Sequence, residues 1–282
     1  MRKITVFTAL VLLVSIFTGC FGTKQSINVV SREDGSGTRG AFIELFSIEE
    51  KNADGTKKDL TTKDSIIANK TDVMLANIES DKSAIGYVSL GSISDTVKAL
   101  AIDGVNASTT NVKNGTYKIY RPFNIATKDN VTGLTKDFID FILSEEGQTV
   151  VSESYIAIND DAPVYDGNKL AGKITVAGSS SVTPIMEKLK EAYLAINPNA
   201  QIEIQMSDST SGMTGAIEGI CDIGMASRDL KDSEKQKLKS IEIALDGIVV
   251  VVNKDNPFSD FTKEQIKQIF IGEITLWSEF AK

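Results

Sequence analysis

The feature that most constrains this fold is a strand–turn–helix pattern that occurs in both halves of the chain. In the first half, residues 27–30 form a short β-branched strand, the glycine-rich turn SREDGSGTRG (31–40) follows, and a helical pattern comes next. In the second half, residues 174–177 and 184–194 flank the turn GSSS (178–181) in the same order. Strands that alternate with helices predict a mostly parallel α/β sheet. A chain of 282 residues is long enough for about two such domains.

Other segments extend this pattern along the chain. The long apolar segment 243–252 predicts a strand that is interrupted by Asp246 and Gly247. Thr262 and Gln265 have the spacing of a capping box at the start of an amphipathic helix. The turn-rich segment 159–172 is the best linker candidate. Further helices are predicted at 41–46, 73–78, 132–151 and 213–220, further strands at 84–88, 123–127, 202–206 and 222–225, and loops at 50–62 and 104–118.

Composition excludes several classes of function. Lys and Arg number 30 against 38 Asp and Glu, and a chain with a formal charge of -8 is a poor candidate for binding nucleic acid. Histidine is absent, which excludes His-based catalytic triads and His-ligated metals. The cysteines are Cys20 and Cys221, too few for a disulfide framework or a four-cysteine zinc site. No cofactor is indicated, and Cys221 is expected to be a small buried hydrophobe.

The first twenty residues have the pattern of an export signal. Arg2 and Lys3 precede an uncharged apolar segment at 4–17, which is shorter than the roughly 20 residues that span a bilayer. The ending Gly19-Cys20 resembles a bacterial lipobox, in which the cysteine is lipidated after residues 1–19 are removed. This predicts a lipid anchor on the extracytoplasmic face of the cell membrane. The alternative is ordinary cleavage near Gly19, with no lipid on Cys20.

Three Ser/Thr/Gly turns have the composition of anion sites. They are residues 35–38, 178–181 and 209–212, and each lies between a predicted strand and a predicted helix. The first N–H groups of a helix lack partners within the helix, and glycine lets the backbone approach a ligand. Arg32 and Arg228 lie beside these turns and can bind an oxyanion through paired hydrogen bonds.

Each of these features also has an ordinary structural explanation. Ser and Thr are common N-caps, so a single such turn is weak support for a binding site. Either arginine can belong to a salt bridge instead. Arg39 is expected to be a surface charge on its helix, and Asp34 is a candidate for orienting Arg32.

Several segments together resemble the phosphate-binding substrate protein of bacterial phosphate ABC transporters. The resemblance implies a two-lobed α/β fold of the periplasmic-binding-protein type II (Venus-flytrap) kind, which closes on inorganic phosphate. It also implies delivery of phosphate to a membrane permease driven by an ATPase. The segments that carry the resemblance are SREDGSGTRGAF, AIGYVSLG, GLTKDFIDFILSEEGQ, GKITVAGSSSVTP, IALDGIVVVVNKDNPF and IFIGEITLW.

The order of these segments differs from the family's usual order. GSSSVTP normally comes first and SREDGSGTR follows IFIGEITLW, whereas here the SREDGSGTR half leads. We therefore interpret the chain as a circular permutant whose old ends are joined through residues 159–172. The second lobe is predicted to be 20–97 plus 246–282 and the first lobe 98–245, with hinges near 243–247 and around 98–123. The rival hypothesis is two fragments on one chain that do not form a single cleft.

The resemblance also assigns a phosphate site residue by residue. The second-lobe contacts are Arg32, Ser36, Gly37 and Thr38. In the first lobe the register of both turns is open by a residue, and the candidates are Ser180, Ser181, Ser209, Thr210, Ser227 and Arg228. Some family members have an aspartate where Ser227 aligns, and that carboxylate accepts the proton of hydrogen phosphate. Selectivity against sulfate is therefore open, with Asp208 or Asp229 as alternative carboxylates.

Two other functions are considered. The first is binding or sensing of another tetrahedral oxyanion, such as sulfate. The second is a secreted phosphoesterase with a serine nucleophile. The absence of histidine and the lack of an evident general base argue against an enzyme, so no catalytic residue and no metal ligand is predicted.

Overall fold

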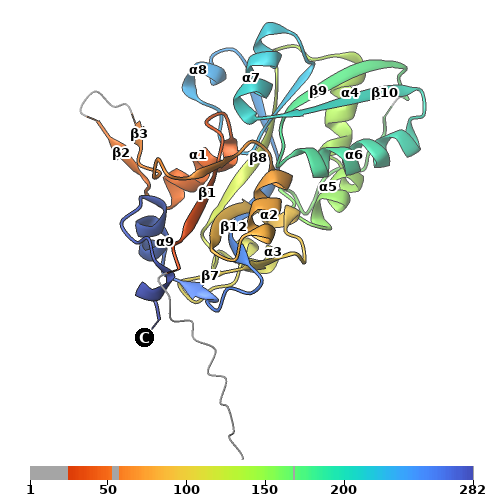
Figure 1. The fold of residues 1–282 in the computed structure, drawn as a ribbon. Coiled ribbons are helices and arrows are strands. Elements are labelled where there is room, and N and C mark those ends of the chain that lie inside the picture. Colours follow the sequence, from red (N-terminus) through yellow and green to blue (C-terminus); the bar gives the residue numbers. More distant parts are fainter. Residues whose placement is uncertain (1–24, 53–56, 168, 282) are drawn as a thin grey trace, which may run out of the picture.

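The protein is built around a large mixed sheet with helices packed against it (Figure 1). The computed structural model describes residues 25–52, 57–167 and 169–281, so the predicted export signal and Cys20 lie outside the described residues. Within those ranges the main sheet has nine strands in the order β10-β9-β11-β8-β12-β5-β1-β4, with β6 paired to β12. These strands are β1 (Asn28–Arg32), β4 (Ile66–Ala68), β5 (Ala84–Ser89), β6 (Val97–Ala99), β8 (Tyr120–Thr127), β9 (Gly172–Ser179), β10 (Ala200–Ser207), β11 (Ile223–Ala226) and β12 (Lys239–Asn253).

One half of the sheet is formed by β12, β5, β1 and β4, in which β1 runs parallel to both of its neighbours. Its core contains a stack of aromatic rings, because Phe42 lies 3.9 Å from Tyr87 and 4.7 Å from Phe270 between ring centroids. Trp277 and Ile248 are buried in the same core. The helices around this half are α1 (Gly37–Leu45), α2 (Thr71–Ser80), α3 (Thr109–Lys113) and α9 (Lys263–Phe270).

The other half contains the parallel strands β10, β9 and β11, and β8 runs antiparallel to β11. Val176 and Ile223 from the sheet are fully buried with Phe138 and Tyr193 from the helices. Cys221 is buried in a smaller adjoining cluster, which confirms its predicted role as a hydrophobe. The helices of this half are α4 (Gly133–Ile142), α5 (Glu145–Ser152), α6 (Thr183–Ile196), α7 (Ser209–Glu218) and the short α8 (Asp232–Lys235).

The long strand β12 joins the two halves. Residues 239–247 pair with β8, and residues 248–252 pair with β5. The sequence predicted that Asp246 and Gly247 interrupt this strand, and that prediction is wrong. The strand continues through both residues, which mark the point where its pairing changes from β8 to β5. Leu100 and Tyr117, which the sequence-based division gave to the first lobe, pack in the core that contains Phe42. The division itself and the two hinges stay predictions.

Local structure departs from prediction where caps and short pairings intervene. The single helix predicted at 132–151 is two helices, because Ser144 accepts a hydrogen bond from the N–H of Gly147 and begins α5. The predicted loop 50–62 overlaps β2 (Glu49–Lys51) and includes its partner strand β3 (Lys57–Asp59). The predicted loop 104–118 includes α3. The capping box of Thr262 and Gln265 is confirmed at the start of α9.

The first and last parts of the described chain are neighbours in space. Ser26 forms an antiparallel bridge with Leu276, and the N–H of Trp277 donates to the carbonyl of Gln25 at 3.0 Å. Trp277 belongs to the short helix η2 (Trp277–Glu279), and the remaining small elements are β7 (Ala101–Ile102), β13 (Asp260–Phe261) and η1 (Leu90–Ser92). Among the described residues, we find no helix with the length and apolarity that a membrane span requires.

Candidate functional site

The three Ser/Thr/Gly turns converge on one buried set of hydroxyl groups between the two halves of the sheet. The Thr38 hydroxyl lies 2.8 Å from that of Ser181 and 3.4 Å from that of Ser227. These contacts join residues more than 140 positions apart in the sequence. We call this set the polar cluster, which comprises the side chains of Arg32, Thr38, Thr71, Ser179, Ser180, Ser181, Ser209 and Ser227, all of them buried.

The cluster lies at the carboxyl ends of parallel strands. Arg32 ends β1, Ser179 ends β9, Ser209 follows β10, and Ser227 directly follows β11. Open α/β sheets bind ligands at this edge, where strands give way to helix N-termini. The helices α1, α2, α6 and α7 all begin here, so their positive ends face the same region.

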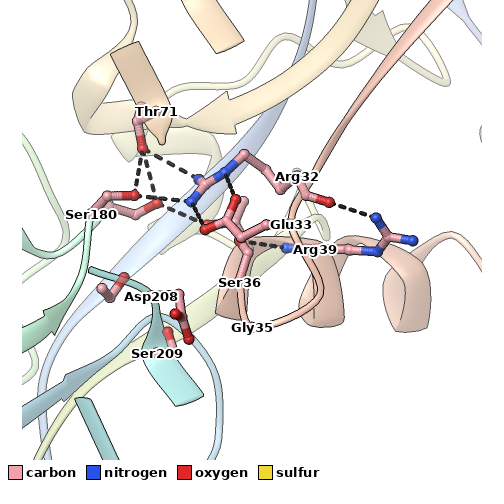
Figure 2. Close-up of polar contacts among 12 residues, drawn as sticks. Arg32, Glu33, Gly35, Ser36, Arg39, Thr71, Ser180, Asp208 and Ser209 are labelled. Carbon is pink, nitrogen blue, oxygen red and sulfur yellow. Dashed lines mark hydrogen bonds and ion pairs between the residues drawn. The ribbon is translucent and has the colours of Figure 1, made fainter. Parts of the chain in front are cut away.

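Arg32 crosses from one half of the cluster to the other (Figure 2). Its Nη2 donates to the Ser180 hydroxyl at 3.0 Å, and its Nη1 donates to the Thr71 hydroxyl at 3.4 Å. Its Nε and Nη2 also bind the Glu33 carboxylate at 2.8 and 2.7 Å. The predicted role of Asp34 is therefore wrong, because that carboxylate is 99% exposed and lies 3.7 Å from Arg39 instead.

The turn between β1 and α1 is held by its own residues. The Ser36 hydroxyl caps α1 by accepting from the N–H of Arg39 at 3.3 Å. Arg39, expected to be a surface charge, also donates from Nη1 to the carbonyl of Arg32 and pairs with Asp59. A Cβ on Gly37 would lie 2.8 Å from the Ser227 hydroxyl oxygen and closer still to that of Ser209. The lack of a side chain at Gly37 thus permits the close approach of the two halves.

Ser209 and Thr210, the two candidates at the α7 turn, lie in different surroundings. Ser209 is fully buried, and its hydroxyl accepts from the N–H of Ser227 at 3.1 Å. Thr210 lies at the margin, where its N–H and hydroxyl both donate to the carbonyl of Gly35 at 3.2 Å. Asp208 caps α7 by accepting from the N–H and hydroxyl of Ser211. Both carboxylate oxygens of Asp208 are therefore engaged outside the polar cluster.

Arg228 is held by an acidic partner at the margin of the cluster. Its Nη1 and Nη2 each bind one oxygen of Glu234 at 2.8 Å, and Nη2 also lies 3.3 Å from the Thr210 hydroxyl. Burial raises the pKa of Glu234, but hydrogen bonds from Arg228 and Lys231 outweigh it and leave that pKa below its ordinary value. This geometry fits the salt bridge considered for Arg228 from the sequence. The neighbouring Asp229 is exposed.

Sequence reasoning missed three side chains in and below the cluster. The Thr71 hydroxyl lies 3.4 Å from those of both Ser180 and Ser181. Arg121 donates from Nη2 to the Thr38 hydroxyl at 2.9 Å and pairs with Asp246. Thr71 could have been suspected as a hydroxyl residue just before a predicted helix. The pair of Arg121 and Asp246 has no motif, because strand register alone brings the two together.

The chemistry of the cluster is that of an anion site. Hydroxyls, a guanidinium and helix N-termini all supply hydrogen-bond donors, and the carboxylate beside them, Glu33, is bound to Arg32. Among residues 25–52, 57–167 and 169–281, we find no group of three or more carboxylate, thiol or imidazole side chains arranged for a metal ion. The arrangement can therefore hold a tetrahedral oxyanion through many short contacts.

Comparison with known proteins identifies the family of the chain. The PBP superfamily domain profile matches residues 12–146 and 163–282. A relative in Streptococcus agalactiae, named phosphate-binding protein PstS 2, is 51% identical over 276 residues, which is 95% of this chain and 94% of the relative. The chain belongs to the PstS family of the PBP superfamily. Both the family resemblance and the two-lobed α/β fold expected from it are thereby confirmed.

Two further comparisons describe the extent of PstS similarity. A crystal structure of a phosphate ABC transporter phosphate-binding protein from Streptococcus pneumoniae is 45% identical, with a TM-score of 0.72. The match covers 90% of this chain and 99% of that one. The PstS of Staphylococcus haemolyticus is 42% identical over 118 residues, which is 39% of this chain and 37% of that protein.

Proposed function

We propose that this PstS-family protein captures inorganic phosphate in the polar cluster for an ABC importer. The observation that carries the proposal is the convergence of donors from both halves of the chain, above all Arg32 Nη2 at 3.0 Å from the Ser180 hydroxyl. Relatives that align over nearly the whole chain are named as phosphate-binding proteins. The chain is accordingly a binding component and not a phosphoesterase.

The proposed contacts follow from burial and direction. A dehydrated phosphate needs many donors to offset the loss of its water shell, and hydrogen bonds to a charged acceptor are the strong ones. Thr210 and Arg228, at the margin, would support the α7 turn rather than touch phosphate. The residues proposed to bind phosphate directly are Arg32, Ser36, Gly37, Thr38, Ser180, Ser181, Ser209 and Ser227, to which Thr71 is added.

Titration calorimetry tests this proposal. The mature protein, freed of bound phosphate by dialysis under denaturing conditions and refolded, is titrated with phosphate and then with sulfate. We expect saturable binding of phosphate at one site, and a phosphate-dependent rise in melting temperature. No heat and no thermal shift with phosphate would contradict the proposal.

Sulfate is the second candidate ligand, and one observation favours keeping it. Ser227 supplies a hydroxyl, which can donate to a fully ionised anion as readily as it accepts from a protonated one. The other carboxylates considered from the sequence do not replace an aspartate here, since Asp208 binds Ser211 and Asp229 is exposed. We therefore expect phosphate to bind more tightly than sulfate by a smaller ratio than a carboxylate at position 227 would give. Ser227→Asp, titrated with both anions, should raise that ratio.

We also propose that the protein is anchored by a lipid on Cys20 after residues 1–19 are removed, on the outer side of the cell membrane. The basic start and the Gly19-Cys20 ending support this assignment. An anchored binding protein would deliver phosphate to its permease and ATPase complex. Cys20→Ser should release the protein into the medium, whereas Cys221→Ser, which changes the buried cysteine, should stay with the membrane. Release of both variants, or of neither, would contradict the anchor.

Finally, we propose that the chain is a circular permutant relative to PstS proteins such as that of S. haemolyticus, in an order that it shares with the S. agalactiae relative, with lobes at 20–97 plus 246–282 and at 98–245. The S. haemolyticus relative aligns over less than half of either chain, and Ser26 lies against Leu276. Both observations support a reordered chain with neighbouring ends. A gene that joins residue 281 to residue 22 and opens within 159–172 should yield a protein with unchanged phosphate affinity. Failure of that protein to fold would contradict the permutation.

A further inference from the structure

A buried ion pair, formed by Arg121 and Asp246, contacts the polar cluster through the Thr38 hydroxyl. Arg121 and Asp246 occupy facing positions on β8 and β12, and their Nη1 and Oδ2 atoms are 2.6 Å apart. Their side chains are 2% and 1% exposed. Burying two charges is costly, and such a pair adds little to stability over an apolar pair of the same volume. A role beyond stability therefore has to be sought in what else the pair contacts.

The second terminal nitrogen of Arg121 reaches the polar cluster. Nη2 donates to the Thr38 hydroxyl at 2.9 Å, so the guanidinium lies between Thr38 and Asp246. The pair is anchored from the side of the fold that contains β5, because the N–H of Gly91 donates to Asp246 Oδ1 at 3.3 Å. The charge of Arg121 is thereby fixed in direction as well as in place.

This contact determines which way the Thr38 hydroxyl can act. A guanidinium has donors and no acceptor, so Thr38 must accept from Arg121. The single O–H of Thr38 is then left to donate away from Arg121, toward Ser181 and Ser227. An ionised oxyanion accepts hydrogen bonds and donates few or none, so a hydroxyl held as a donor suits it. The positive Arg121 also adds to the positive end of α1, which begins one residue before Thr38.

We propose that Arg121, held by Asp246, is a positioning residue for phosphate binding that fixes the Thr38 hydroxyl as a donor to the anion. This rests on the proposed function, since it requires that the polar cluster is where phosphate binds. The proposal extends the phosphate site from the Ser/Thr turns to β8 and β12, the strands where the two halves of the sheet join. Arg121 itself does not need to touch phosphate.

A double-mutant cycle with Thr38 tests the proposal by calorimetric titration with inorganic phosphate. The variants are Arg121→Gln with Asp246→Asn, which removes both charges, keeps the size of side chain 246 and shortens side chain 121, then Thr38→Val, and then all three changes together. We expect the pair variant to weaken phosphate binding about tenfold or more. In the Thr38→Val background the same pair change should cost less than about twofold, because its effect passes through Thr38.

A matched control separates the loss of a site hydroxyl from the loss of any buried hydroxyl. Thr127 is also a buried threonine, at the other end of β8, and its hydroxyl has no hydrogen-bond partner. Thr127→Val should bind phosphate as the wild type does. Thermal melting and circular dichroism check that each variant folds. If the pair variant does not fold, Arg121→Lys is used instead, because it keeps a charge beside Asp246. It should still weaken phosphate binding when Thr38 is present and should weaken it less in the Thr38→Val background.

The outcomes are distinct. Affinity of the pair variant within twofold of wild type, or an equal loss with and without the Thr38 hydroxyl, would overturn the positioning role. A wild type that does not bind phosphate would instead overturn the proposed function. A shared loss of binding in Thr127→Val would indicate damage to β8 rather than a role for Arg121.

Discussion

The ends of β1 and β11 have similar sequences but different chemistry. Each strand leads into an arginine beside a Ser/Thr turn, and each arginine has a glutamate partner, Glu33 for Arg32 and Glu234 for Arg228. Arg32 presents Nε and Nη2 to its carboxylate, which leaves Nη1 for Thr71 and lets Nη2 reach Ser180. Arg228 presents Nη1 and Nη2, so both of its terminal nitrogens are occupied.

The difference shows how a carboxylate can either orient a guanidinium or occupy it. A guanidinium has five N–H donors in a rigid fork, and the edge that the carboxylate takes decides which donors remain. Glu33, the next residue in the sequence, binds Nε and Nη2 of Arg32, whereas Glu234, six residues from Arg228, binds both terminal nitrogens of that arginine. We therefore propose that Arg32 is available to an anion at the centre, whereas Arg228 is a structural link at the margin.

The largest expected effect comes from Arg32. Arg32→Ala removes the guanidinium that faces Ser180 and Thr71, so phosphate affinity should fall about 100-fold, or about 3 kcal/mol. Titration calorimetry measures the change, with Arg228→Gln as the matched variant at the other strand end. Equal losses in the two variants would erase the distinction between the two arginines.

Gly37→Ala should have the next largest effect. The added methyl would lie 2.8 Å from the Ser227 hydroxyl oxygen, so the two halves could not approach as closely, and affinity should fall about tenfold or more. Gly40→Ala is the control on the same helix, since its nearest neighbour would be Arg228 at 4.0 Å. That control should bind phosphate normally and gain about 0.5–1 kcal/mol of stability from better helix propensity. Normal binding by both variants would argue against a close approach at Gly37.

The sequence predicted the elements of this fold well and their connections less well. The Ser/Thr/Gly turns were identifiable because strand and helix patterns flank them, and local composition is enough to mark a helix start. The break between α4 and α5 was not apparent, because apolar periodicity continues across Ser144 and only the cap ends it. Similarly, nothing local reveals that β12 exchanges β8 for β5 at Gly247.

The candidate site likewise contains residues that the sequence identifies and residues that it does not. Arg32 and Thr38 lie within a recognisable segment, and the structure brings them together with Ser180 and Ser181. Arg121 depends on a register between strands more than 100 residues apart, which sequence spacing does not encode. The sequence does not distinguish the adjacent carboxylates Glu33 and Asp34 as partners of Arg32, whereas the structure pairs Glu33 with it and leaves Asp34 exposed.

Arg228→Gln should change stability more than binding. Phosphate affinity should stay within about threefold of wild type, because the contact of Arg228 with the cluster is limited to Thr210 at the margin. The variant should lose about 1–2 kcal/mol of unfolding free energy, since Glu234 loses hydrogen bonds to a charged partner. Urea denaturation measures this loss. A tenfold loss of affinity would instead place Arg228 among the phosphate contacts.

The smallest expected effect is the pH dependence of the stability that the ion pair between Arg228 and Glu234 contributes. Because the pKa of Glu234 is held below its ordinary value of 4.5 in the folded protein, its pairing with Arg228 stabilises the fold above that pH. As the pH falls through the folded pKa, the carboxylate takes up a proton and the contribution is lost. The difference in unfolding free energy between wild type and Glu234→Gln should therefore be constant from about pH 7 to 5 and shrink below about pH 4.5. Phosphate binding should not respond in the same way, because it depends on Arg32 and not on Arg228. Phosphate affinity at neutral pH should therefore be the same in wild type and Glu234→Gln. A stability difference that persists to the lowest pH at which both proteins fold would mean that the pairing is not what Glu234 contributes.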